Sequence, residues 1–175
     1  MKKLVLGSAI LAVLGMTSSA MAANSGTVNF TGAVSTATCN LSMKDSAGAD
    51  IANVDLGVLA SNATADATAV TFKLVPQEAD CLKKADASMV WTSPTLTATG
   101  FSNAAKNGTN ATMSLQATNT ITADKVIKQG NTSFDYKATA GIQSFDFSAQ
   151  LKRPTAGTMT AGPFSATASY VVAYK

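Results

Sequence analysis

The chain has 175 residues, a length typical of one domain, with only 13% charged residues, a formal net charge of +3 and no histidine. The absence of histidine excludes Ser-His-Asp and Cys-His catalytic sets, and two cysteines alone do not make a zinc site, so we expect no metal and no cofactor. The small net charge argues against nucleic acid as a partner, because phosphate binding needs a basic face.

The first 22 residues have the features of a secretory signal peptide. A basic pair, Lys2-Lys3, precedes an apolar run from Leu4 to Gly15, and Ala20-Met21-Ala22 matches a small-x-small cleavage site. The apolar run is too short for a membrane span. We therefore expect export, removal of residues 1–22 and a soluble mature chain that begins at Ala23.

The segment after the cleavage site alternates in a way that suits a β-strand. Gly26, Val28, Phe30, Gly32 and Val34 would share one face of that strand. The segment is either the first strand of the chain's own sandwich or a free tail. Glycines at alternate positions weaken an internal strand, but they suit a strand that approaches a partner's groove closely.

Two cysteines, Cys39 and Cys81, lie 42 positions apart. In an exported chain an even number of cysteines favours a disulfide, and two buried free thiols are the alternative.

The remaining sequence predicts an all-β sandwich, because short strand-like runs alternate with turn residues. The predicted strands are 27–34, 54–59, 69–75, 89–92, 112–118, 133–138, 142–152 and 164–174. A short helical turn is expected around Gln77–Lys84. An exposed loop is expected at Asn103–Asn110, which contains an Asn-Gly step.

The end of the chain is its most informative part. Six side chains alternate onto one strand face, namely Phe164, Ala166, Ala168, Tyr170, Val172 and Tyr174. The sequence stops one residue later, at Lys175. A buried strand in this position exposes a hydrogen-bonding edge unless another strand pairs with it. That strand could come from another molecule.

No residue set points to an enzyme, since the carboxylates are scattered and suit solvated loops. Trp91 is expected in the core, with sugar stacking as the alternative. Lys125, Lys128 and Lys137 form a loose basic group. We interpret these lysines as solvated surface, and the alternative is a site for an acidic sugar such as sialic acid.

Together these features resemble the pilin subunits of chaperone–usher fimbriae. The resemblance is carried by the opening Gly26–Val34, by Cys39 and Cys81, and by the ending, in which Gly162 lies fourteen residues from the C terminus and Tyr174 is penultimate. The segments 113–119 and 142–152 are similar to the major subunits of sialic-acid-binding fimbriae from enterotoxigenic bacteria.

The resemblance implies an incomplete immunoglobulin-like sandwich that lacks its final strand and is completed by donor-strand complementation. It divides the chain into a signal peptide (1–22), an N-terminal donor-strand extension (23–34) and a pilin domain (35–175). The implied donor residues are Asn24, Gly26, Val28, Phe30 and Gly32. The implied acceptor groove comprises Gly162, Phe164, Ala166, Ala168, Tyr170, Val172 and Tyr174, with a second wall near Val34–Ala37.

The implied function is that of a structural subunit of an adhesive fimbria. Its partners would be a periplasmic chaperone, an outer-membrane usher and copies of itself, and it would reach the bacterial surface through the periplasm and support attachment to host cells. The alternative is a lectin-like adhesin subunit that itself binds acidic host glycans.

Overall fold

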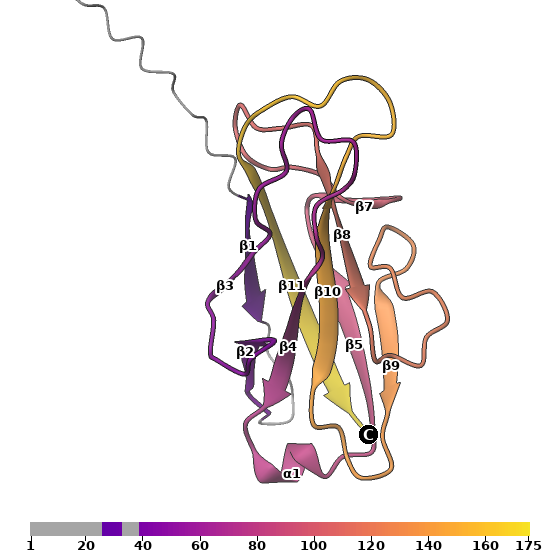
Figure 1. Ribbon diagram of the computed structural model, residues 1–175. Helices are drawn as coiled ribbons and strands as arrows, with labels where there is room; N and C mark the ends of the chain where they lie inside the picture. Colours follow the sequence, from indigo (N-terminus) through magenta and orange to yellow (C-terminus); the bar gives the residue numbers. More distant parts are fainter. Residues whose placement is uncertain (1–25, 33–38) are drawn as a thin grey trace, which may run out of the picture.

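A computed structural model of the protein describes the backbone of residues 26–32 and all of residues 39–175. Two β-sheets pack face to face and form an elongated sandwich (Figure 1). The predicted signal peptide, Asn24 and the groove wall predicted near Val34–Ala37 lie outside the described residues.

The first sheet contains the two ends of the described chain. Its five strands follow the order β3 (Asn53–Asp55), β1 (Gly26–Gly32), β11 (Phe164–Tyr174), β5 (Asp86–Thr92) and β9 (Ser133–Lys137). The second sheet has six strands in the order β2 (Leu41–Asp45), β4 (Val70–Pro76), β10 (Phe145–Lys152), β8 (Thr112–Ala117), β7 (Gly100–Phe101) and β6 (Leu96–Thr97).

One helical turn, α1 (Ala79–Leu82), connects the two sheets at one end of the sandwich, where Gln77–Lys84 was predicted to be helical. Some strand boundaries differ from the prediction. The strand expected at 54–59 ends at Asp55, where the Asp55 carboxylate accepts a hydrogen bond from the Gly57 N–H at 2.9 Å and Gly57 adopts a φ of 71°. A positive φ does not continue a strand, and glycine tolerates it.

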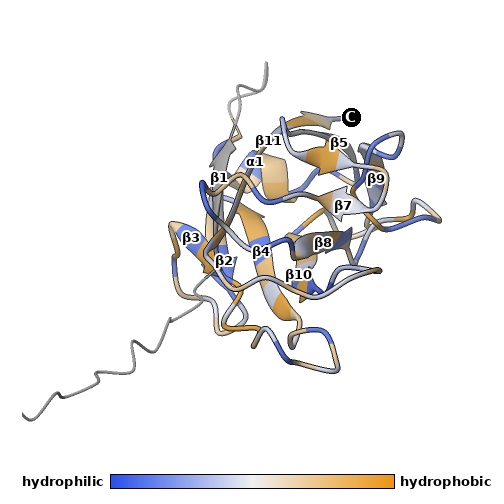
Figure 2. Cartoon of the chain, turned by 90° about the horizontal axis from the view of Figure 1, so that it is seen from above, coloured by the Kyte–Doolittle hydropathy of each residue, from blue (hydrophilic) through white to orange (hydrophobic). Residues whose placement is uncertain are grey.

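The core lies between the sheets and is built on aromatic side chains. Trp91 is buried, as expected, and its ring lies edge-on to Phe147 with ring centroids 5.2 Å apart. Phe147 in turn stacks on Phe72 at 5.3 Å. Figure 2 looks along the sandwich, so that the two layers and their hydropathy are seen end-on. Pairs of this kind add to the energy of area burial and fix how the sheets pack.

The strand pairing explains why the immunoglobulin-like sandwich is incomplete. Strand β11 pairs with β5 on one side in the antiparallel sense, and no described strand follows β11 to pair with its other side. That side is taken by β1, from the opposite end of the sequence. Among the strand pairs of the described residues, only β1 and β11 are parallel.

Candidate functional site

The candidate site is the groove along β11. The alternating side chains of this strand face the core, since Phe164, Ala166, Ala168, Tyr170 and Val172 are buried and Tyr174 is partly buried. On this face the small Ala166 and Ala168 lie between Phe164 and Tyr170. The candidate site is therefore the apolar face of one buried strand, along the edge where it pairs with β1.

The backbone of β1 lies along this edge over seven positions. In the parallel register, Gly26 lies opposite Phe164, Val28 opposite Ala166, Phe30 opposite Ala168 and Gly32 opposite Tyr170. Four of the five predicted donor residues thus lie directly beside four of the predicted groove residues, within one chain.

The far side of β1 pairs with β3, so the groove has two hydrogen-bonding sides. Thr27, Val28 and Asn29 lie opposite Asp55, Val54 and Asn53 in the antiparallel register. Val54 and the following Leu56 are buried in the core. The sequence predicts a strand at 54–59 but does not indicate that it pairs with the tail. The alternation of Val54 and Leu56 indicates a buried strand, but nothing local says which neighbour it pairs with.

Gly162, which precedes β11, lies close against the backbone of the 103–110 loop. Its φ is 153°, and a Cβ atom there would lie 2.8 Å from the backbone oxygen of Asn107 and 2.9 Å from the backbone nitrogen of Thr109. Only glycine allows this close approach of β11 to the 103–110 loop.

Asn103 fastens the same loop to the start of β11. Its side-chain amide donates to the carbonyls of Thr109 and Pro163, both at 2.8 Å, and its oxygen accepts from the N–H groups of Ala105 and Ser165, both at 2.9 Å. The loop predicted to be exposed therefore also has a structural role, which its composition did not indicate.

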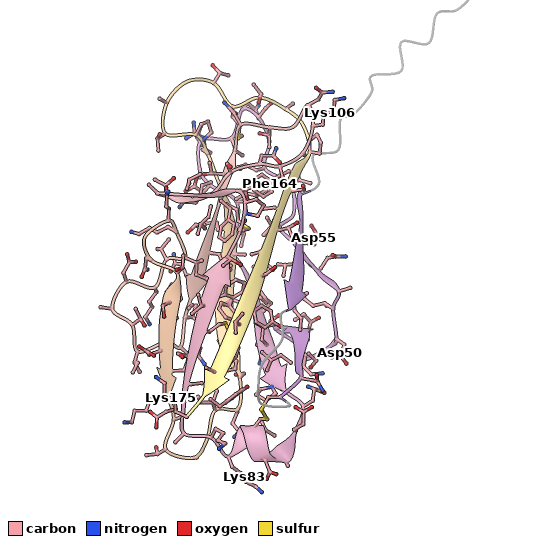
Figure 3. The ribbon with its side chains drawn as sticks, turned by 180° about the vertical axis from the view of Figure 1, so that it is seen from behind. Asp50, Asp55, Lys83, Lys106, Phe164 and Lys175 are labelled. Carbon is pink, nitrogen blue, oxygen red and sulfur yellow. A yellow bond between two sulfur atoms is a disulfide. The ribbon has the colours of Figure 1, made fainter. Side chains whose placement is uncertain are left out.

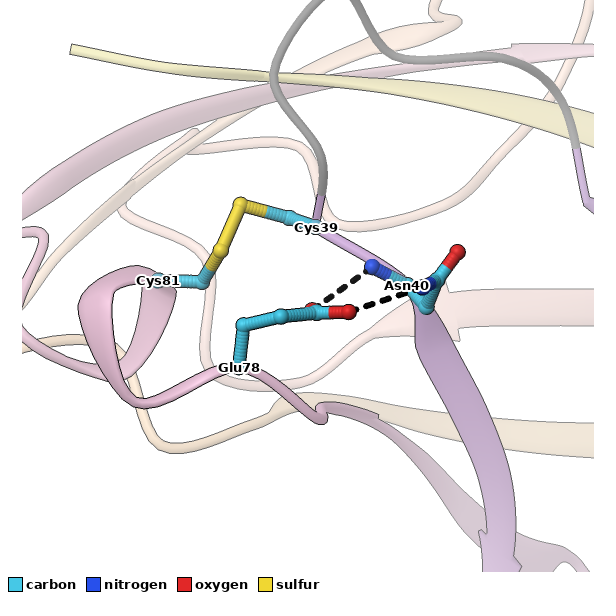
Figure 4. The surroundings of a disulfide bond; sticks show 4 residues. All are labelled: Cys39, Asn40, Glu78 and Cys81. Atoms are coloured by element: carbon cyan, nitrogen blue, oxygen red, sulfur yellow. Dashed lines mark hydrogen bonds between the residues drawn. A yellow bond between two sulfur atoms is a disulfide. The ribbon is translucent and has the colours of Figure 1, made fainter.

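The opposite end of the groove is anchored by the predicted disulfide. Cys39 and Cys81 are bonded, with Cα atoms 6.0 Å apart (Figure 4). Next to the bond, Glu78 accepts two hydrogen bonds from the backbone and side-chain nitrogens of Asn40, each at 2.7 Å. Cys39 and Asn40, which follow the tail in the sequence, are thus fixed to α1 and to the turn that precedes it.

The two tyrosines of β11 have raised pKa values. Burial raises the pKa of Tyr170, and burial, together with the negative charges of Glu78 and Tyr170, raises the pKa of Tyr174 to about 12. The ring centroids of Tyr170 and Trp91 are 5.4 Å apart, and those of Tyr174 and Phe145 are 6.1 Å apart. Near pH 7 these tyrosines therefore remain neutral and contribute packing.

The three lysines considered for an acidic sugar have local partners. Lys125 donates to the carbonyl of Thr118 at 2.8 Å, and Lys128 lies 2.9 Å from the carboxylate of Asp124. Lys137, at the end of β9, lies 3.7 Å from the carboxylate of Asp86. These contacts explain the lysines as surface ion pairs and hydrogen bonds, and no further observation favours a sugar site.

Within residues 39–175 and β1, no group of three or more His, Cys, Asp or Glu side chains is placed to hold a metal ion. None of the described helices has the length and apolar character that a membrane span requires.

Comparison with known proteins agrees with this geometry. The model of the fimbrial protein family matches residues 28–175. The K99 fimbrial protein of Escherichia coli is 36% identical over 99% of both chains, and the F107 fimbrial protein of Escherichia coli is 33% identical over 100% of both.

The chain belongs to the fimbrial protein family. The crystal structure of the P pilus rod subunit PapA shares its fold, with a TM-score of 0.51 and 21% identity over 79% of this chain and 100% of that one. Members of this family are structural subunits of fimbriae, and the protein is accordingly a pilin subunit and not an enzyme.

Proposed function

We propose that this fimbrial protein polymerises by donor-strand exchange, in which the tail of one subunit fills the groove beside β11 of the next. One observation carries the proposal: among the described strands, the edge of β11 that faces away from β5 pairs with the N-terminal segment β1. The slot between β11 and β3 accepts an extended segment of the tail's sequence.

The energetics favour such an exchange. An inserted strand forms main-chain hydrogen bonds with an edge that would otherwise be unsatisfied. Burial of the donor residues Val28 and Phe30 would contribute on the order of 3–6 kcal/mol before ordering costs. Each subunit would donate its tail to one neighbour and accept a tail from another, so the contact is head-to-tail and extends into a fibre.

This mechanism assigns the remaining partners. A periplasmic chaperone would keep the groove filled after export, and an outer-membrane usher would exchange the chaperone for the next subunit's tail. The product would be a fimbria on the bacterial surface that supports attachment to host cells.

The test compares two single substitutions in the tail. Phe30→Asp places a charge opposite Ala168, in the apolar slot, whereas Asn29→Asp places one at the adjacent position, opposite Thr167. Each variant is produced with its chaperone and usher, and fibres are counted by electron microscopy. We expect Phe30→Asp to form the chaperone complex but no fibres, and Asn29→Asp to form fibres. Normal fibre yield from Phe30→Asp would contradict the donor assignment.

A further inference from the structure

The tail in this structure fills the groove of its own chain. All seven residues of β1 pair with β11 of the same molecule, and three of them also pair with β3. The groove that polymerisation would use is therefore occupied without any second subunit.

The direction of this pairing follows from where the tail is tethered. Figure 3 shows Phe164 and Lys175 at opposite ends of the sandwich, with the disulfide and α1 at the Lys175 end. Because Cys39 is bonded to Cys81 of α1, Cys39 lies at the Lys175 end of the sandwich. In the parallel pairing, Gly32 is the end of β1 that lies nearer to Cys39.

An antiparallel insertion of the same tail would exceed the reach of the chain. It would place Gly32 opposite Phe164, about 33 Å from the far end of the eleven-residue strand β11. The seven Cα-to-Cα steps from Gly32 to Cys39 span at most about 25 Å. A tail from another subunit has no such tether and can enter in either direction.

We propose that the free subunit is a closed monomer, in which the chain's own tail binds in parallel to β11 and prevents the groove from accepting another subunit. The block on polymerisation rests on the proposed function, whereas the pairing of β1 with β11 in the monomer does not. A closed subunit can neither donate its tail to another subunit nor accept another subunit's tail, because its own tail occupies its own groove.

Competition favours the closed state in dilute solution. A segment joined by a short linker meets its site at a local concentration in the mM range, whereas free subunits at about 1 µM supply roughly a thousandfold less. A tail from another subunit can therefore win only where the groove is opened or held open before the two subunits meet.

Cysteine pairs measure the direction and the molecularity together. In the parallel register Thr27 lies opposite Ser165, and neighbouring strands are spaced within the Cα distance that a disulfide needs. In an antiparallel insertion over the same stretch, Thr27 would instead lie opposite Ser169, about 13 Å further along β11. The test pair is Thr27→Cys with Ser165→Cys, and the matched control is Thr27→Cys with Ser169→Cys.

Both variants are prepared as mature chains with the Cys39–Cys81 bond intact, oxidised at about 1 µM, and analysed by size exclusion and peptide mass spectrometry. We expect an intramolecular bond between residues 27 and 165 in a monomer, and none between 27 and 169. A bond between 27 and 169, bonds found only between molecules, or no bond in either variant would each overturn the closed monomer.

A second measurement separates this inference from the proposed function. The cross-linked monomer is mixed with a peptide spanning Ala23–Val34 and, separately, with the chaperone and usher. Each experiment is done before and after selective reduction of the bond between residues 27 and 165. We expect polymerisation at least a hundredfold below that of the wild type before reduction, and recovery after it. If the cross-link forms but neither the reduced variant nor the wild type polymerises, the proposed function fails and the closed monomer stands. If the wild type polymerises and no cross-link forms, the closed monomer fails and the proposed function stands.

Discussion

Trp91 of β5 and Tyr170 of β11 lie directly opposite each other in the antiparallel pair, with ring centroids 5.4 Å apart. Through Phe147, whose ring lies edge-on to Trp91, the same indole also contacts the opposite sheet. Tyr170 belongs to the groove that we propose along β11, so that groove and the core would share one aromatic cluster. Loss of packing in the core should therefore also loosen the groove.

Replacing Trp91 with alanine tests this cluster. The side chain is 1% exposed, and its removal leaves a cavity between the sheets. We expect a loss of about 3–5 kcal/mol in the free energy of unfolding, measured by urea denaturation of the oxidised chain.

The neighbouring Val90 provides the control. It lies on the outer face of the same strand and is 41% exposed, opposite Val171. Val90→Ala should change the free energy of unfolding by no more than about 0.5 kcal/mol. Equal effects from the two substitutions would contradict the assignment of Trp91 to the core.

The disulfide should contribute strongly to stability. It closes a loop with a sequence separation of 42, which corresponds to about 4 kcal/mol in the chain-entropy model. We expect the double variant Cys39→Ala with Cys81→Ala to lose about 2–5 kcal/mol in unfolding experiments. This variant has no cysteine left, so it should melt like the reduced wild-type chain. A variant as stable as the oxidised wild type would refute the prediction.

Gly162 is predicted to tolerate no side chain, because a Cβ atom would collide with the backbone of the 103–110 loop. Gly162→Ala should lower the free energy of unfolding by about 1–3 kcal/mol. Gly157 has a φ of 78°, but no atom lies within 4 Å of the position that its Cβ would take, so Gly157→Ala carries only the conformational cost. Thermal melting should show the larger loss for Gly162→Ala, and a larger loss for Gly157→Ala would exclude the contact as its cause.

Much of the fold could be predicted from local sequence patterns. Strand β11 was predicted with its observed boundaries, since eleven alternating residues leave one interpretation. Strand β2 was missed because only Leu41 and Met43 alternate with polar residues, which is too short a pattern to predict a strand. Strands β6 and β7 have two residues each, which is too short for any period to appear.

The strands beside β11 could be predicted less completely, because their pairing depends on contacts between distant segments. The buried face of β11 follows from period two, and glycines at alternate positions indicated the tail. The pairing of β3 with β1 depends on tertiary packing, and so does the way in which Asn103 fastens its loop to the start of β11. Neither relationship leaves a signature within one segment.

Alkaline pH should unfold the protein through its tyrosines. Burial raises the pKa of Tyr136, Tyr170 and Tyr174, and it raises that of Tyr174 from 10.0 to about 12. Nearby negative charges contribute less: Asp146 raises the pKa of Tyr136, and Glu78 and Tyr170 raise that of Tyr174. The unfolded chain releases these protons near pH 10, whereas the folded chain keeps them. Between pH 10 and 12 the unfolded state thus binds fewer protons, so stability is complete below pH 10 and falls as the pH rises. Melting temperatures from pH 8 to 12 should show this decline, and Tyr174→Phe should make it shallower. An unchanged slope in that variant would mean that Tyr174 does not contribute to it.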